Sequence, residues 1–124
     1  MFAQSYEPLP QISVEDFAEY LAQRQDHPGV VAPLQLLDVR EPQEVAIAHL
    51  EGFVNLPLSQ FEAWSGQVLA QLDPDTETIV MCHHGIRSAH MCQWLAHQGF
   101  THVKNLAGGI AAYAIRVDPS IPQY

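Results

Sequence analysis

Short apolar segments alternate with amphipathic helical patterns along most of this 124-residue sequence. The clearest of them, Thr78-Ile79-Val80-Met81, has the length and β-branched character of a buried strand and runs straight into Cys82. Strands that alternate with helices indicate an α/β fold with a mainly parallel sheet. In such sheets, ligands bind at the carboxyl ends of the strands. We therefore expect Cys82 to lie where a binding site would form.

Apolar spacing and capping residues predict the other elements, with no repeats or low-complexity tracts between them. Ser13 is placed to cap the first helix, Ser88 to cap the helix after the Cys82 loop, and Gly99 to end that helix. We expect one domain over residues 1–124, with its core at about 12–116 and a C-terminal tail at 117–124. The expected strands are residues 11–12, 34–39, 53–56, 78–81 and 102–106, and the expected helices are residues 13–24, 42–48, 61–72, 88–98 and 110–116.

The chain carries a net negative charge, which limits the kinds of partner that it can bind. Its formal net charge is −9, and only five residues are lysine or arginine. Binding to nucleic acid or to an anionic membrane needs a basic face, so neither partner is expected. No apolar run approaches the ~20 residues that span a bilayer, and Met1 to Glu7 lack the basic start of a signal peptide. We expect a cytoplasmic protein.

The loop after the 78–81 strand has the composition of a nucleophilic site. A tight loop between a strand and a helix directs backbone N–H groups toward Cys82, beside the positive end of the helix. This environment favours the thiolate, which is the nucleophilic form of cysteine. Gly85 allows the loop to curl its amides inward, and Arg87 supplies a permanent cation that can hold an anionic substrate. Cys82 is therefore the candidate nucleophile.

The spacing Cys-x-x-Gly-x-Arg-Ser over Cys82 to Ser88 resembles the active-site loop of the rhodanese family of sulfurtransferases. The resemblance covers about Ile12 to Tyr124, and the ending Val117 to Tyr124 is similar to that of rhodanese domains fused behind the adenylating enzymes of molybdopterin and thiamine sulfur transfer. Further segments resemble family motifs in the same order, namely Leu37 to Glu44 (Asp-Val-Arg-Glu), His49 to Gly52, Asn55 to Pro57, and Asn105 to Gly109 (Leu-x-Gly-Gly).

The resemblance implies a five-stranded, mainly parallel sheet flanked by helices on both faces. It also implies a sulfurtransferase that carries sulfane sulfur as a covalent persulfide on Cys82, with no separate cofactor. The sulfur would come from a small anionic donor such as thiosulfate or polysulfide, or from a persulfidated protein of a sulfur relay, and would pass to cyanide, a thiol or an acceptor protein. By position, Asp38 and Arg40 would support the site. The substrate-binding residues would be His83, His84, Gly85, Ile86, Arg87 and Ser88.

Three positions depart from the family pattern. Many active members carry arginine or lysine directly after the cysteine, whereas this chain has His83. The permanent positive charge is thereby reduced, which predicts weak use of thiosulfate, although a protonated imidazole would restore the cation. Tyr113 stands where tryptophan is usual, and Phe53 replaces a small residue. We interpret these two as packing changes.

Other functions and simpler interpretations stay open. Rhodanese-like domains also serve as non-catalytic interaction or regulatory modules, although inactive ones often lack the cysteine. Related dual-specificity phosphatases place five residues between cysteine and arginine, whereas this loop has four, which suits a sulfur substituent better than a phosphate.

Asp38 and Arg40 could form an internal salt bridge or cap loop amides, and Cys92 is expected to be inert and packed. The histidines lack cysteine partners at metal-ligand spacing, so no metal site is expected.

Overall fold

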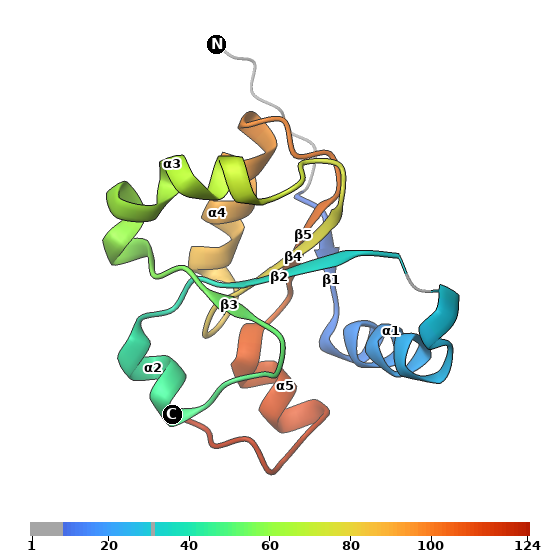
Figure 1. Cartoon of the computed structure of the whole chain (residues 1–124). Coiled ribbons are helices and arrows are strands. Elements are labelled where there is room, and N and C mark those ends of the chain that lie inside the picture. The colour runs from blue at the N-terminus through green and yellow to red at the C-terminus, as the bar shows by residue number, and fades with distance from the viewer. Residues whose placement is uncertain (1–8, 31) are drawn as a thin grey trace.

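Five parallel strands form one sheet in the order β1-β5-β4-β2-β3 (Figure 1). The all-parallel pairing confirms the expected α/β class. The computed structural model describes residues 9–30 and 32–124, so the expectation for Met1 to Glu7 lies outside the described residues. The strands are β1 (Gln11–Ile12), β2 (Leu34–Asp38), β3 (Val54–Asn55), β4 (Glu77–Met81) and β5 (Val103–Leu106).

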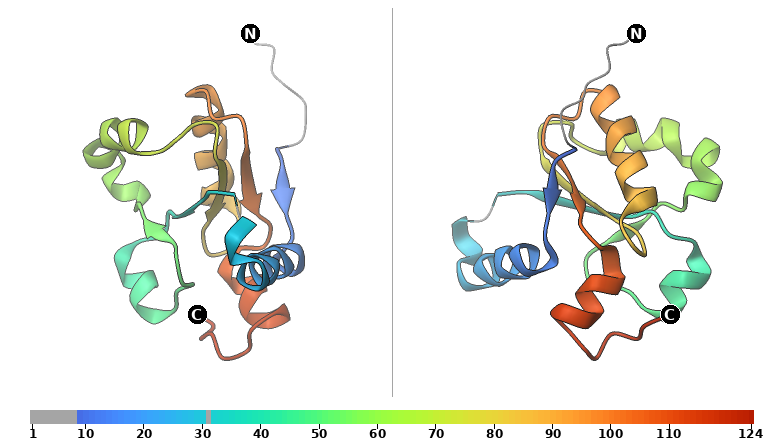
Figure 2. Two further views of the ribbon diagram at one scale, coloured as in Figure 1. Left: turned by 45° about the vertical axis from the view of Figure 1, so that its right-hand side comes forward. Right: turned by 180° about the vertical axis from the view of Figure 1, so that it is seen from behind.

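Helices connect the strands and cover both faces of the sheet. They are α1 (Val14–Asp26), α2 (Pro42–Ile47), α3 (Phe61–Gln71), α4 (Ile86–His97) and α5 (Gly109–Arg116), with short 3₁₀ turns η1 (Pro28–Val30) and η2 (Leu58–Gln60). α3 and α4 pack on one face, and α1 and α5 pack on the other (Figure 2). No helix within the described ranges is long and apolar enough to cross a membrane.

The side chains of β4 alternate between two apolar cores. Ile79 and Met81 pack with α1 and α5, whereas Val80 and Cys82 pack with α3 and α4. Successive strand residues point to opposite faces, and β4 is covered on both, so all four side chains are buried. Cys82 therefore leaves the strand on the side of α3 and α4.

The register of β2 on β4 brings two candidate segments together. Asp38 lies opposite Met81, and the Val39 N–H donates to the Met81 carbonyl over 3.0 Å. Arg40 lies two residues after the end of β2, and Cys82 directly follows β4. Because the strands are parallel, both segments emerge at the same edge of the sheet, as expected for a site in this class of fold.

The start of α4 differs from the expectation. The helix begins at Ile86, because Gly85 takes a φ of +100° and turns the chain into the helix two residues earlier than predicted. Ser88 lies inside the helix, so its predicted capping role is wrong. The predicted left-handed Gly99 after this helix is confirmed by its φ of +98°.

Candidate active site

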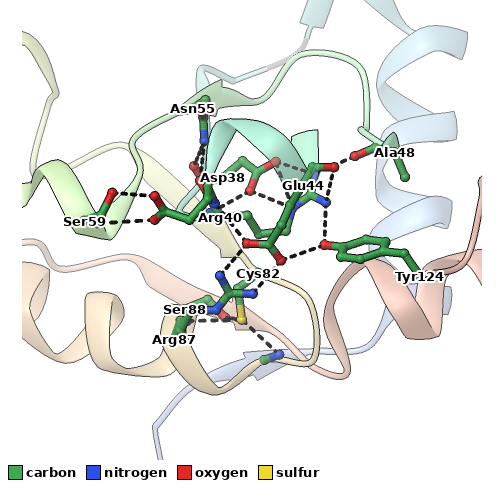
Figure 3. A network of polar contacts seen from close by, with 12 residues as sticks. Asp38, Arg40, Glu44, Ala48, Asn55, Ser59, Cys82, Arg87, Ser88 and Tyr124 are labelled. Atoms are coloured by element: carbon green, nitrogen blue, oxygen red, sulfur yellow. Dashed lines mark hydrogen bonds and ion pairs between the residues drawn. The ribbon is translucent and has the colours of Figure 1, made fainter. Parts of the chain in front are cut away.

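The Cys82 sulfur lies within the loop that joins β4 to α4 (Figure 3). Its Sγ accepts hydrogen bonds from the backbone N–H of Gly85 at 3.1 Å and from that of Ser88 at 3.4 Å. The Ser88 hydroxyl lies 3.3 Å from the same sulfur. Cys82 is only 1% exposed, so these donors face little competition from water. Donors that converge on one sulfur stabilise a negative charge there.

The two cysteines differ in the pKa of their thiols. Burial acts to raise the pKa of Cys82, but hydrogen bonds from Ser88, Gly85 and His84 outweigh it and hold the pKa below its ordinary 9.0. Burial, and then the charge of Cys82, raise the pKa of Cys92 to about 12. Because the thiolate is the nucleophile, Cys82 is prepared for chemistry and Cys92 is not.

The N-terminal end of α5 holds the loop in its conformation. The N–H of Ile110 donates to the carbonyl of Cys82, and the N–H of Ala111 to that of His83, each over 3.0 Å. These carbonyls are thereby held toward α5, which leaves the loop N–H groups turned toward the sulfur. Gly109, with a φ of +63°, permits this approach, because a Cβ there would lie 2.4 Å from both carbonyl oxygens.

Asn105 on β5 ties the neighbouring strand to the same loop. Its amide N–H donates to the Gly85 carbonyl at 2.9 Å, and its side-chain oxygen accepts from the Ser88 hydroxyl. A hydroxyl carries one hydrogen, so Ser88 donates either to Asn105 or to the Cys82 sulfur. A negatively charged sulfur favours the second arrangement. Asn105 therefore positions a donor that responds to the charge of Cys82.

Asp38 and Arg40 form a buried ion pair next to the loop. The Arg40 Nη2 and Nε lie 2.8 and 3.0 Å from the Asp38 carboxylate oxygens, which confirms the internal salt bridge. The guanidinium also donates to the carbonyls of Ala48 at 2.8 Å and Glu44 at 3.3 Å, at the end of α2. The pair thus fixes α2 against the sheet. Its importance for the sulfur site stays a prediction.

Arg87 is engaged in a bidentate ion pair with Glu44 of α2. Its Nη1 and Nη2 lie 2.7 and 3.0 Å from the two carboxylate oxygens (Figure 3). Glu44 also accepts the Tyr124 hydroxyl and the Glu41 N–H, each at 3.0 Å. Its bond with Arg87 outweighs burial and lowers the pKa of Glu44 to about 2. The cation predicted to hold a substrate is therefore paired within the chain.

The two loop histidines lie at the rim of this site. The His83 ring stacks on the Tyr124 ring, with centroids 3.9 Å apart and an angle of 4° between the planes. The centroid of the His84 ring lies 3.9 Å from that of His83. Burial, and then the neighbouring His84, hold the pKa of His83 below its ordinary 6.5. The imidazole is therefore neutral at neutral pH and does not supply the missing cation. The side chain of Ile86 is turned outward and is 69% exposed.

Three residues of the site, Glu44, Asn105 and Tyr124, were not among the predicted ones. Asn105 and Tyr124 lie in segments that resemble family motifs, but nothing local assigns them a contact. Glu44 had a local signal, since Glu41-Pro42-Gln43-Glu44 has the spacing of a capping box, which explains its bond to Glu41 but not its bond to Arg87. Within the described residues, no three His, Cys, Asp or Glu side chains lie together as metal ligands.

The rate of Cys82 alkylation by iodoacetamide is expected to inflect at a lower pH in the folded protein than in the unfolded chain, where the thiol behaves as a free cysteine. The reason is that the folded state lowers the pKa of this thiol. The rate should be measured against pH in a Cys92→Ser background, with the urea-unfolded protein as control, whose inflection should return to the free value. An inflection at or above the free value in the folded protein would contradict a stabilised thiolate.

Comparison with known proteins places these features in a family. The profile of the rhodanese-like domain matches residues 17–116. The chloroplastic Rhodanese-like/PpiC domain-containing protein 12 of Arabidopsis thaliana is 44% identical over 95% of this chain and 38% of its own length. The probable adenylyltransferase/sulfurtransferase MoeZ of Mycobacterium tuberculosis is 36% identical over 73% of this chain and 23% of its own length. The chain thus spans less than half of either protein.

A shorter relative and solved structures agree with this placement. The thiosulfate sulfurtransferase GlpE of Shewanella oneidensis is 34% identical over 64% of this chain and 75% of its own length. A rhodanese-related protein of Thermoplasma volcanium superposes with a TM-score of 0.69 at 24% identity, over 93% of this chain and 99% of that one. The human single-domain sulfurtransferase TSTD1 superposes with a TM-score of 0.66 at 23% identity, over 88% of this chain and 98% of that one. From its sequence and its fold, this chain belongs to the rhodanese-like domain family.

Proposed function

We propose that this chain is a sulfurtransferase that carries sulfane sulfur as a persulfide on Cys82. The donor would be thiosulfate, polysulfide or a persulfidated protein, and the acceptor would be cyanide, a thiol or a protein. The observation that carries the proposal is the set of N–H and O–H donors around the Cys82 sulfur, which lower the pKa of this thiol. The names of MoeZ and GlpE, both sulfurtransferases, support it.

The chemistry requires only the thiolate and a leaving group. The Cys82 thiolate attacks the outer sulfur of the donor, a new S–S bond forms, and the S–S bond of the donor breaks. The leaving group departs with the electron pair, as sulfite when the donor is thiosulfate. The acceptor then attacks the outer sulfur of the persulfide and releases the Cys82 thiolate. The N–H and O–H groups that stabilise the thiolate also stabilise the negative charge that returns to Cys82 in this second step.

The loop also offers hydrogen-bond donors that can stabilise the charge of a persulfide. The N–H groups of Gly85 and Ser88 surround Sγ, and the Ser88 hydroxyl can turn from Asn105 toward the sulfur. With four residues between Cys82 and Arg87, the ring of amides is small. This supports a sulfur substituent as the group that the loop accommodates.

The intact mass of the protein tests the proposal. After incubation with thiosulfate or polysulfide and removal of excess donor, we expect a gain of one sulfur atom, which a thiol reductant or cyanide should remove. Cyanide should be converted to thiocyanate in the same amount. If iodoacetamide still alkylates Cys82 rapidly but neither donor adds sulfur, the chain is not a sulfur carrier, and a non-catalytic interaction module becomes the better interpretation.

A further inference from the structure

The anion-binding position of Arg87 is already filled by Glu44. Both terminal nitrogens of the guanidinium contact a carboxylate oxygen, at 2.7 and 3.0 Å. This is the two-pronged geometry in which arginine binds a free carboxylate or another planar anion. A donor anion that approached Arg87 would have to displace Glu44 or accept a position next to its charge.

Glu44 is held in this position from several sides. It accepts hydrogen bonds from the Glu41 N–H and from the Tyr124 hydroxyl, each at 3.0 Å. The Tyr124 hydroxyl in turn accepts from Arg40 at 2.8 Å, and Arg40 also binds the Glu44 carbonyl at 3.3 Å. The carboxylate is thus built into the frame of the site, and its displacement would break bonds beyond the one to Arg87.

Within the described residues, no other lysine or arginine near Cys82 is left without a bonding partner. The ring of His83 is neutral at neutral pH, because burial lowers its pKa. The other four lysine and arginine residues are engaged elsewhere: Arg40 with Asp38, Lys104 with Glu77, Arg116 with Glu15, and Arg24 with the Ala32 carbonyl. The charged groups that a sulfur donor meets are therefore the Arg87–Glu44 pair, which is neutral as a whole, and the Cys82 thiolate.

We propose that Glu44 determines the donor specificity of the Cys82 site by acting as an internal counter-ion of Arg87, which disfavours dianionic donors such as thiosulfate. The donor class that fits is a hydropersulfide carried on an organic thiol, whose sulfane sulfur bears at most one negative charge. This inference rests on the proposed function for its statement about donors. The statement about charge at the site does not depend on sulfur transfer.

The charge statement can be tested with two alkylating agents of similar size. Iodoacetate is an anion and iodoacetamide is neutral, so the ratio of their rate constants at Cys82 reports the charge that a small anion meets. We expect Glu44→Gln to raise this ratio about tenfold, since loss of a charge-assisted contact changes an equilibrium by roughly that factor or more. Glutamine keeps the shape of the side chain and an oxygen for the Glu41 N–H.

Glu77→Gln is the matched control. Glu77 pairs with Lys104 at 3.0 Å, and the side chains of that pair are 29% and 42% exposed, close to the 20% and 36% of Glu44 and Arg87. The substitution changes the net charge by the same amount, at the amino end of β4, while Cys82 follows the carboxyl end. We expect its ratio of rate constants to equal that of the unmodified chain. An equal rise in both variants would assign the effect to net charge and overturn the inference.

Sulfur transfer supplies the second readout. Glu44→Gln should raise kcat/KM for thiosulfate, with cyanide as acceptor, by about tenfold, and should change kcat/KM for a small-thiol hydropersulfide by much less. A folded Glu44→Gln protein in which neither the alkylation ratio nor kcat/KM for thiosulfate changes would overturn the role of Glu44. If the alkylation ratio rises but no variant takes sulfur from any donor, the charge role of Glu44 stands and the proposed function fails.

Tyr124→Phe keeps the test decisive if Glu44→Gln does not fold. It removes the hydrogen bond from the Tyr124 hydroxyl to Glu44 and the one that this hydroxyl accepts from Arg40, while the ring remains available to stack on His83. The Glu44 carboxylate is then held less firmly on Arg87. We expect a rise in the alkylation ratio in the same direction but smaller, and an unchanged ratio in the folded Tyr124→Phe protein would contradict the proposal.

Discussion

Replacing Cys82 with serine is expected to abolish sulfur loading, whereas replacing Cys92 with serine should leave it intact. A serine hydroxyl does not ionise near neutral pH and forms no persulfide, so the Cys82→Ser protein should show no added sulfur mass with any donor. The loop should keep its conformation, since the contacts from Ile110 and Ala111 that hold it use backbone atoms. The measurement is the intact mass after donor treatment, beside an unfolding curve that verifies the fold.

Cys92 provides the matched control for this experiment. It is fully buried within α4, and the pKa of its thiol is raised to about 12, so it neither ionises nor reaches a donor. A buried hydroxyl without a partner costs about 1–3 kcal/mol, so Cys92→Ser should lower the free energy of unfolding by that amount without loss of loading. Loss of added sulfur in the Cys92 variant alone, with the fold intact, would reverse the assignment of the two cysteines.

The strand, loop and helix around Cys82 could be predicted because their signals are local. The apolar run of β4, the cysteine that follows and Gly85 three residues later all lie within one short segment. The structure that these residues form depends on backbone geometry that the residues themselves favour, such as the positive φ of Gly85. The parallel sheet followed from the alternation of strands and helices in the same way.

The partner of Arg87 could not be predicted, because it depends on how distant segments meet. Glu44 lies 43 positions from Arg87, and Tyr124 lies 80 positions from Glu44. No periodicity in the sequence connects residues at such separations. Only the register of β2 on β4 brings the end of β2, and with it α2, beside the Cys82 loop. A cation that the sequence predicts to be free can therefore be paired in the fold.

The role of Ser88 shows a different limit. A serine placed after a loop and before an apolar helix is typical of an N-cap. Gly85 starts the helix earlier, and this shift turns Ser88 into a residue whose hydroxyl and N–H face the Cys82 sulfur. Ser88 therefore contacts the Cys82 sulfur, for a reason that the capping pattern did not contain. A shift of two residues at a helix start changes the function of a side chain.

The second large effect concerns stability and arises from the buried pair of Asp38 and Arg40. Arg40 is 0% exposed. Its guanidinium donates hydrogen bonds to the Asp38 carboxylate, the Ala48 carbonyl and the Tyr124 hydroxyl, and the shortest distance to each of these groups is 2.8 Å. The carbonyls at the C-terminal end of a helix lack partners within the helix, and a cation there is favourable. Arg40 therefore compensates a buried carboxylate and caps α2 at the same time.

Arg40→Ala is expected to lower the free energy of unfolding by about 3–5 kcal/mol, the cost of leaving one member of a buried ion pair without its partner. Asp38, which is 2% exposed, would keep its charge without the guanidinium or would have to take up a proton. Arg87→Ala is the matched control, because it breaks the partly exposed pair of Arg87 and Glu44, whose side chains are 36% and 20% exposed. Partly exposed pairs contribute less than buried ones, and Glu44 keeps its bonds from Glu41 and Tyr124, so the control should lose clearly less stability than Arg40→Ala. Urea unfolding of the three proteins measures the difference. Equal losses in the two variants would mean that water or local rearrangement compensates Asp38, and that the pair is not what anchors α2 beside the sulfur site.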